Sequence, residues 1–369
     1  EENLKAAQLL FEQNQHEKAI ETCKKILNNN KNEIGALKLI AKSCLATKRI
    51  EDARLYLKQV LSLKSDDYEV IKDLGNTYQA TGDINTAKDY YQQAISINAN
   101  YAPALTNLGS LELKTGNKQE ALSLLIKATK VDPQLAPAWL NLSNAYLQSG
   151  QLQEAEQTLR KTVELIPGSF QAHLNLGTVL KNLGKLEQAE ISLRKSIDLN
   201  PNLFTSHYLL ANIFIGQKKL LETKKSLQKT IELKPDFVEA HLNLGAVLKD
   251  LGRVQEAELS LRRLIALKPN FAMAYSNLGT ILKDLNQLKE SEMYLRKAIE
   301  LDPSLAIAHN NLGNTLRDQG RFEEAELEEK KVIDISFIQE IDPKHRDKCE
   351  KLLNLSKSQF RQDLFALCE

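Results

Sequence analysis

Apolar residues recur along this chain in a pattern that repeats every 34 positions. A ladder of small residues runs in steps of 34 from Ala19 to Ala325, and a second such ladder lies twelve positions upstream of it. Within each unit the large apolar residues follow helical spacings of three and four, as at Trp139, Leu142 and Tyr146. A unit of this length buries its apolar face only by stacking on its neighbours. The pattern therefore predicts an all-α solenoid of about ten helix-turn-helix repeats.

Glycine and proline mark the ends of the predicted helices. A glycine separates the two helices of six units, and a proline closes six of the later units. Glycine suits the left-handed residue just past a helix end, and proline disfavours a continued helix. In the seventh unit, about residues 204–237, Ala211, Lys218 and Thr223 replace the usual Gly, Gly and Ala. We expect lower local stability in that unit.

One unit contains almost the whole set of recurring positions: Trp139, Leu142, Ser143, Tyr146, Ala155, Leu159 and Pro167. This set resembles the tetratricopeptide repeat, whose pattern is W-x2-L-G-x2-Y, then A-x3-F, then P. The resemblance covers about residues 3–337. It implies a right-handed α-solenoid in which the first helix of each repeat lines an inner, concave surface. We expect this array to occupy residues 1–337.

An asparagine stands just before the Leu-Gly or Leu-Ser pair of six units. A carboxamide offers a donor and an acceptor together, so a row of them could hold a peptide backbone without reading its side chains. The row resembles the asparagine ladder of the O-linked N-acetylglucosamine transferase superhelix, which implies an extended polypeptide bound in the concave groove. The alternative is a relic of repeat duplication that makes interhelical hydrogen bonds. Asp73 and Leu209 interrupt the row, whose members are Asn107, Asn141, Asn175, Asn243, Asn277 and Asn311.

A set of charged residues continues the same helix face toward the end of the first helix. Charges of alternating sign are typical of a solvated surface, and the alternative is contact with polar side chains of a ligand. Lys181 belongs to the same series. The candidate ligand-binding members are Lys249, Lys283 and Arg317, each followed by an aspartate, namely Asp250, Asp284 and Asp318.

The composition narrows the classes of function. The formal net charge is +1, which gives no electrostatic reason to expect nucleic acid or an anionic membrane as a partner. No apolar run approaches the ~18 residues of a membrane span. The four cysteines do not form a disulfide framework, and no nucleotide-binding or zinc-binding motif is present. We therefore expect a cytoplasmic segment with no catalytic residue, cofactor or metal of its own.

Four histidines occupy the repeat position that Trp139 holds in its unit: His173, His207, His241 and His309. Successive repeats lie roughly 8–10 Å apart or more, whereas metal ligands must all lie ~2 Å from one ion. Equivalent residues along a solenoid cannot converge in that way, so we predict a structural packing role for these histidines.

The pattern loses its register after Ala325. Pro303 and Pro343 are 40 residues apart rather than 34, and Glu328 and Glu329 polarise a face that should be packed. We expect a capping or linker helix over residues 338–357.

The segment from Ser358 to Leu367 resembles the opening of FkbM-type S-adenosylmethionine-dependent methyltransferase domains, which implies that residues 358–369 begin a catalytic domain. The sequence thus favours an interaction superhelix that recruits a polypeptide to a methyltransferase within a longer protein. A free-standing scaffold and the substrate arm of a glycosyltransferase are the alternatives.

Overall fold

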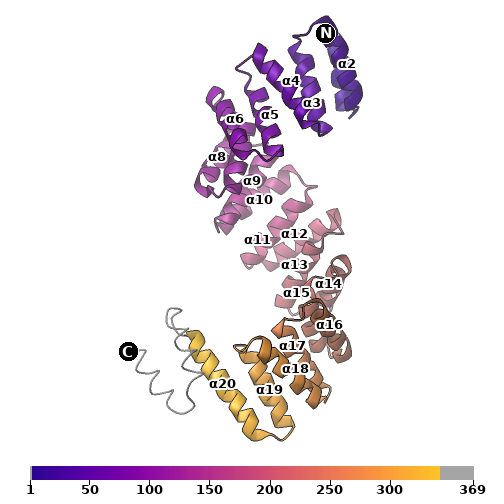
Figure 1. Cartoon of the computed structure of the whole chain (residues 1–369), viewed down its shortest axis with the longest axis vertical. Helices are drawn as coiled ribbons and strands as arrows, with labels where there is room; N and C mark the ends of the chain where they lie inside the picture. Colours follow the sequence, from indigo (N-terminus) through magenta and orange to yellow (C-terminus); the bar gives the residue numbers. More distant parts are fainter. Residues whose placement is uncertain (1, 341–369) are drawn as a thin grey trace, which may run out of the picture. The chain divides into compact units, whose positions relative to one another are not determined.

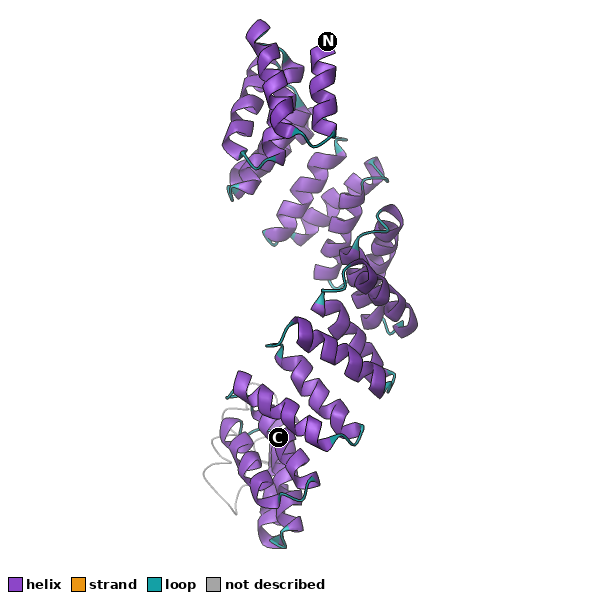
Figure 2. Cartoon of the chain, turned by 90° about the vertical axis from the view of Figure 1, so that its right-hand side faces the viewer, coloured by secondary structure: helices purple, strands orange, loops and turns teal. Residues whose placement is uncertain are grey.

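The computed structural model describes residues 2–340, and within that range every regular element is an α-helix (Figures 1 and 2). This confirms the predicted all-α solenoid. The odd-numbered helices are α1 (Glu2–Glu12), α3 (Ile34–Ala46), α5 (Tyr68–Ala80), α7 (Ala102–Lys114), α9 (Ala136–Gln148), α11 (Phe170–Asn182), α13 (Phe204–Gly216), α15 (Val238–Asp250), α17 (Ala272–Asp284) and α19 (Ala306–Asp318). The even-numbered helices are α2 (His16–Asn29), α4 (Ile50–Leu63), α6 (Ile84–Ile97), α8 (Lys118–Val131), α10 (Leu152–Leu165), α12 (Leu186–Leu199), α14 (Leu220–Leu233), α16 (Val254–Leu267), α18 (Leu288–Leu301) and α20 (Phe322–Glu340).

The chain divides into two compact units, residues 1–199 and residues 200–369. Among the described residues, the first unit holds α1–α12 and the second holds α13–α20. Within each unit every helix packs against the next one in sequence, and the contact is most extensive between the two helices of a repeat. Each odd-numbered helix is therefore the first helix of a repeat and each even-numbered helix is the second.

The turn inside each repeat requires one residue in the left-handed region. Six glycines hold this position, and in the other four repeats a non-glycine residue adopts the same conformation at the same place. Lys218 is one of these, with φ at 58°. A side chain in this region is destabilised by contact between its Cβ atom and the backbone. The other three non-glycine residues in this conformation are Asn14, Lys48 and Asn286.

The two ladders of small residues let the helices of a repeat approach closely. All ten members of the ladder from Ala19 to Ala325 are buried. In the upstream ladder, a Cβ atom added to Gly279 would lie 2.5 Å from Cγ of Leu295 on the partner helix. Such an approach is too short for a carbon-carbon contact, so the leucine fills the space that glycine leaves.

The last described helix, α20, contains the polar residues that break the repeat pattern. Glu328 of α20 is buried and its carboxylate contacts His309 and Lys331, while Glu329 pairs with Arg317 of α19. The buried charge is thus compensated rather than left on an unpaired face. Residues 338–340 of the expected capping segment belong to α20. The rest of that segment and the expected methyltransferase start at 358–369 lie outside the described residues.

Candidate polypeptide-binding surface

The six asparagines of the ladder occupy equivalent places on odd-numbered helices. Asn107, Asn141 and Asn175 lie on α7, α9 and α11 of the first unit. The three members of the second unit, Asn243, Asn277 and Asn311, lie on α15, α17 and α19. All six side chains are half-buried, so their carboxamides lie at the edge of the packed interior.

Odd-numbered helices of successive repeats also contact one another directly. Contacts of this kind join α1 with α3 and α7 with α9 in the first unit, and α15 with α17 and α17 with α19 in the second. No two even-numbered helices in the described part of the chain are in comparable contact. In these four pairs the first helices of successive repeats therefore lie directly beside each other.

Three of the asparagines use their amide groups between repeats. Nδ2 of Asn107 donates to Oδ1 of Asn76 at 2.7 Å, and Nδ2 of Asn175 donates to Oδ1 of Asn144 at 3.4 Å. The amide of Asn311 donates to the hydroxyl of Ser276 at 3.3 Å. These are the interhelical hydrogen bonds that the sequence raised as the alternative to ligand binding. The acceptors were not identified from the sequence. The signal was present, because Asn76 and Asn144 each stand 31 residues before their donors.

The other three asparagines, Asn141, Asn243 and Asn277, make no side-chain hydrogen bond to any described residue. Their amide groups keep both donor and acceptor capacity. A half-buried carboxamide with free capacity can bind a ligand at a smaller desolvation penalty than one that must first break a bond.

In the first unit the acceptor Asn76 joins a wider network. Its Oδ1 atom also accepts from the hydroxyl of Tyr91 at 2.9 Å, and its Nδ2 atom donates to Asp73 at 3.4 Å. Asp73 is the residue that interrupts the asparagine ladder, and Lys72 binds it at 2.5 Å. The ladder thus passes there into an internal polar cluster.

The charged set forms ion pairs that run from one repeat to the next. Nζ of Lys249 lies 3.3 Å from Asp284, and Nζ of Lys283 lies 3.4 Å from Asp318. Arg317 binds Glu329 of α20, while Asp250 and Lys181 make no ion pair with a described residue. All the paired side chains are partly exposed, so each pair contributes about 0–1 kcal/mol.

The histidines serve the packing role that the sequence predicts. In five repeats a ring nitrogen at this position faces the carbonyl of the proline six residues earlier, which ties the start of the odd-numbered helix to the turn before it. The distances are 2.9 Å for Trp139, 3.0 Å for His173, 3.0 Å for His207, 2.9 Å for His241 and 3.1 Å for His309.

Across residues 2–340 no group of three or more His, Cys, Asp or Glu side chains is arranged to hold a metal ion. The two described cysteines, Cys23 and Cys44, are free and buried, and burial raises the pKa of the Cys23 thiol to about 11. A thiol with a raised pKa is a poor nucleophile, so it belongs to the core. None of the helices between Glu2 and Glu340 is both long and apolar enough to cross a bilayer.

Four family models match the sequence. The longest match covers residues 99–318 and is to the cilia and flagella-associated protein 70 C-terminal domain. Residues 1–60 match subunit 3 of the anaphase-promoting complex, or cyclosome. Residues 73–101 and 306–336 each match a tetratricopeptide-repeat model. A search of curated proteins found no match.

Many solved structures match this chain. YrrB, described as a TPR protein with an unusual peptide-binding site, is 24% identical, covers 53% of this chain and 100% of its own, and has a TM-score of 0.44. Pseudomonas aeruginosa PilF is 19% identical, covers 56% of this chain and 94% of its own, and has a TM-score of 0.48. The anaphase-promoting complex assembly Cut9–Hcn1 is 17% identical, covers 81% of this chain and 59% of its own, and has a TM-score of 0.46.

Proposed function

This chain belongs to the family of the cilia and flagella-associated protein 70 C-terminal domain, a tetratricopeptide-repeat family, and on that premise we propose that it binds an extended polypeptide along its odd-numbered helices. Tetratricopeptide arrays mediate protein–protein interaction, and their stacked repeats create extended surfaces for that purpose. The fold alone does not identify the ligand, so the proposal rests on the residues of one surface.

The observation that carries the proposal is the free hydrogen-bonding capacity of Asn243 and Asn277. These residues stand at equivalent positions of α15 and α17, which are in contact, and neither carboxamide bonds to a described residue. A peptide backbone presents donors and acceptors at regular intervals along its length. Two carboxamides on adjacent helices can each take one donor and one acceptor from such a backbone.

The neighbouring charges would add polar contacts at the end of the same helices. Asp250 has no ion-pair partner among the described residues, and the pairs Lys249–Asp284 and Lys283–Asp318 are long and partly exposed. Weak exposed pairs can exchange partners at little free-energy cost. A polypeptide with mixed polar side chains therefore suits this surface better than a uniformly acidic or basic one.

The test begins with random twelve-residue peptides displayed on phage and selected on the whole chain. For a selected peptide, the double variant N243A/N277A should lose about 0.5–1.5 kcal/mol of binding free energy per lost hydrogen bond. Gln255→Ala is the matched control, because it removes an exposed carboxamide from the even-numbered helix α16. Selection of no peptide, or equal affinity of the double variant and the control, would overturn the proposal.

We also propose, from the resemblance of residues 358–367, that this surface recruits a polypeptide to a methyltransferase. Those residues lie outside the described part of the chain, so the proposal stands on sequence alone. Calorimetric titration of the full-length native protein with S-adenosylmethionine tests it. One binding site would support the methyltransferase, and no binding would leave a scaffold without an attached enzyme of this class. The asparagine ladder's resemblance to that of a glycosyltransferase arm motivates the same titration with a nucleotide sugar.

A further inference from the structure

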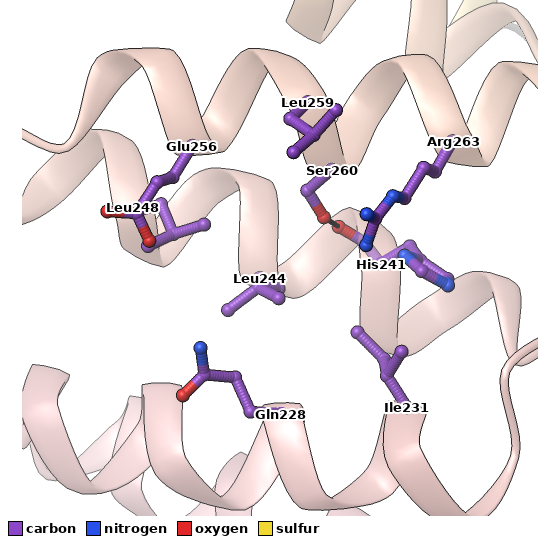
Figure 3. Close-up of a pocket in the computed structure, with 9 residues that line it drawn as sticks. All are labelled: Gln228, Ile231, His241, Leu244, Leu248, Glu256, Leu259, Ser260 and Arg263. Atoms are coloured by element: carbon purple, nitrogen blue, oxygen red, sulfur yellow. Dashed lines mark hydrogen bonds between the residues drawn. The ribbon is translucent and has the colours of Figure 1, made fainter.

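A cavity of about 190 Å³ lies between α14, α15 and α16 of the second unit. Figure 3 shows His241 and Ser260 at one end of it, with the Arg263 guanidinium pointing inward from α16. Leu244 of α15 and Ile231 of α14 supply apolar wall. None of the ladder asparagines lines this cavity.

One nitrogen of His241 has no hydrogen-bond partner. The side chain is 4% exposed, and its Nε2 atom faces the carbonyl of Pro235 at 2.9 Å. Because a carbonyl oxygen only accepts, Nε2 carries the hydrogen. Nδ1 is buried and unpaired. Buried polar atoms without a partner are rare in folded proteins, and each such atom needs an explanation.

In the tenth repeat the Nδ1 atom of the equivalent histidine has a hydrogen-bond partner. His309 is the equivalent of His241 two repeats later, and its Nε2 atom likewise faces a proline carbonyl, that of Pro303. There, however, Nδ1 lies 2.6 Å from the carboxylate of Glu328, and that carboxylate also accepts from Lys331 at 2.8 Å. A buried histidine, a buried carboxylate and a partly exposed cation thus form one cluster.

The equivalents of Glu328 and Lys331 in the eighth repeat are Ser260 and Arg263, each 68 residues earlier. The histidine and the cation are therefore retained, and only the carboxylate is missing. Ser260 donates to the backbone carbonyl of His241 at 3.2 Å and leaves Nδ1 without a partner.

Arg263 is available for a ligand. It is exposed and makes no ion pair with a described residue. At the equivalent place in the seventh repeat, Lys229 pairs with Glu232 at 2.7 Å. The eighth repeat has Ala266 where that glutamate stands, so it provides no acid three residues after Arg263.

We propose that the cavity between α14, α15 and α16 binds a carboxylate supplied by a ligand, held by His241 Nδ1 and the Arg263 guanidinium as Glu328 is held by His309 and Lys331. A guanidinium fork matches the two oxygens of a carboxylate. Because Nδ1 has almost no exposed surface, a carboxylate can reach it only when side chains that line the cavity move aside.

Binding takes up one proton. The neutral ring carries its single hydrogen on Nε2, so Nδ1 can donate to a carboxylate only after it gains a second hydrogen and the ring becomes imidazolium. The other charged group that lines the cavity is Glu256 of α16, which is paired with Arg253, and α14 contributes no charged group to the lining. Affinity for a carboxylate should therefore rise as pH falls.

The first experiment follows the whole chain labelled with ¹⁵N-histidine during titration with sodium acetate. Added acetate at about pH 6 should move the Nδ1 signal of His241 from that of a bare nitrogen to that of a protonated one. The response should weaken as pH rises, because binding takes up a proton. An unchanged Nδ1 signal at every acetate concentration would overturn the proposal.

Two variants separate the contributions. R263Q should weaken acetate binding about tenfold, because it removes a charged hydrogen-bond donor. S260E should place a carboxylate of the protein beside Nδ1 of His241. Nδ1 should then be protonated without acetate, and added acetate should not change its signal. The matched controls K195Q and S192E change the equivalent residues beside His173, whose nitrogens are not buried and unpaired, and should leave the His241 response intact. Normal acetate binding by R263Q would contradict the proposed site.

A second titration distinguishes the source of the carboxylate. The capped tripeptide Ac-Ala-Glu-Ala-NH2 represents an acidic side chain of a partner protein, and its glutamine analogue is the control. Tighter binding of the glutamate peptide than of acetate assigns the site to a partner polypeptide. Equal binding assigns it to small free carboxylates. Binding of the glutamine analogue as strongly as the glutamate peptide would reject carboxylate recognition.

Discussion

The carboxylate of Glu328 lies 2.6 Å from Nδ1 of His309, and both side chains are buried between α19 and α20. Burial raises the pKa of the Glu328 carboxyl, but the hydrogen bonds from His309 and Lys331 outweigh it, so the pKa lies below its ordinary value of 4.5. A carboxyl with a depressed pKa stabilises the fold above its unfolded-state pKa and loses that contribution as pH falls through the folded-state value.

We predict that Glu328→Ala destabilises the last repeat by about 1–3 kcal/mol, because it leaves Nδ1 of His309 buried without a partner. The difference in unfolding free energy between the variant and the native chain should have its full value near about pH 6. It should shrink below pH 4.5, the ordinary pKa of the carboxyl. Hydrogen exchange of α19 and α20 measures it locally. Glu329→Ala is the control, since its pair with Arg317 is partly exposed. Equal effects of the two variants would contradict a stabilising role for the buried pair.

A second prediction separates the asparagines that bond between repeats from those that do not. Asn107→Ala removes the donor of the 2.7 Å bond to Asn76 and should cost about 1 kcal/mol of unfolding free energy. Asn277→Ala removes a carboxamide that bonds to no described residue and should change stability by less than about 0.5 kcal/mol. Urea denaturation followed by circular dichroism compares them. If both variants lost the same stability, the distinction between structural and ligand-binding asparagines would fail.

A third prediction concerns the left-handed residue of the seventh repeat. Lys218 adopts a φ of 58° where most repeats have glycine. Lys218→Gly removes the strain of a Cβ atom in the left-handed region but increases the conformational entropy of the unfolded chain. The net effect should be a stabilisation of about 0.5–1 kcal/mol. The reciprocal variant Gly252→Lys, at the matching position of the next repeat with φ at 71°, should destabilise by a similar amount. Thermal melting of the pair is the measurement, and a loss of stability in both would show that Lys218 contributes a compensating contact.

The helical array can be predicted from the sequence alone, because each repeat shows the same local pattern and ten repeats in register reinforce one another. Each turn depends on a few residues whose backbone preferences act within the turn, as at Gly252 and Lys218. Each buried small residue, such as Ala19 or Gly279, marks a helix pair that is adjacent in sequence. The shared packing role of the histidines was predictable for the same reason.

The three-dimensional structure was needed to show which residues at equivalent repeat positions also make equivalent hydrogen bonds. Asn107 is bonded and Asn277 is not, because the acceptor is set by a residue of the preceding repeat and by the distance between two packed helices. Nδ1 of His309 is paired and Nδ1 of His241 is not, because the residue packed against the ring is Glu328 in one repeat and Ser260 in the other. A hydrogen bond requires two groups within about 3 Å of each other, and repeat spacing alone does not specify that distance.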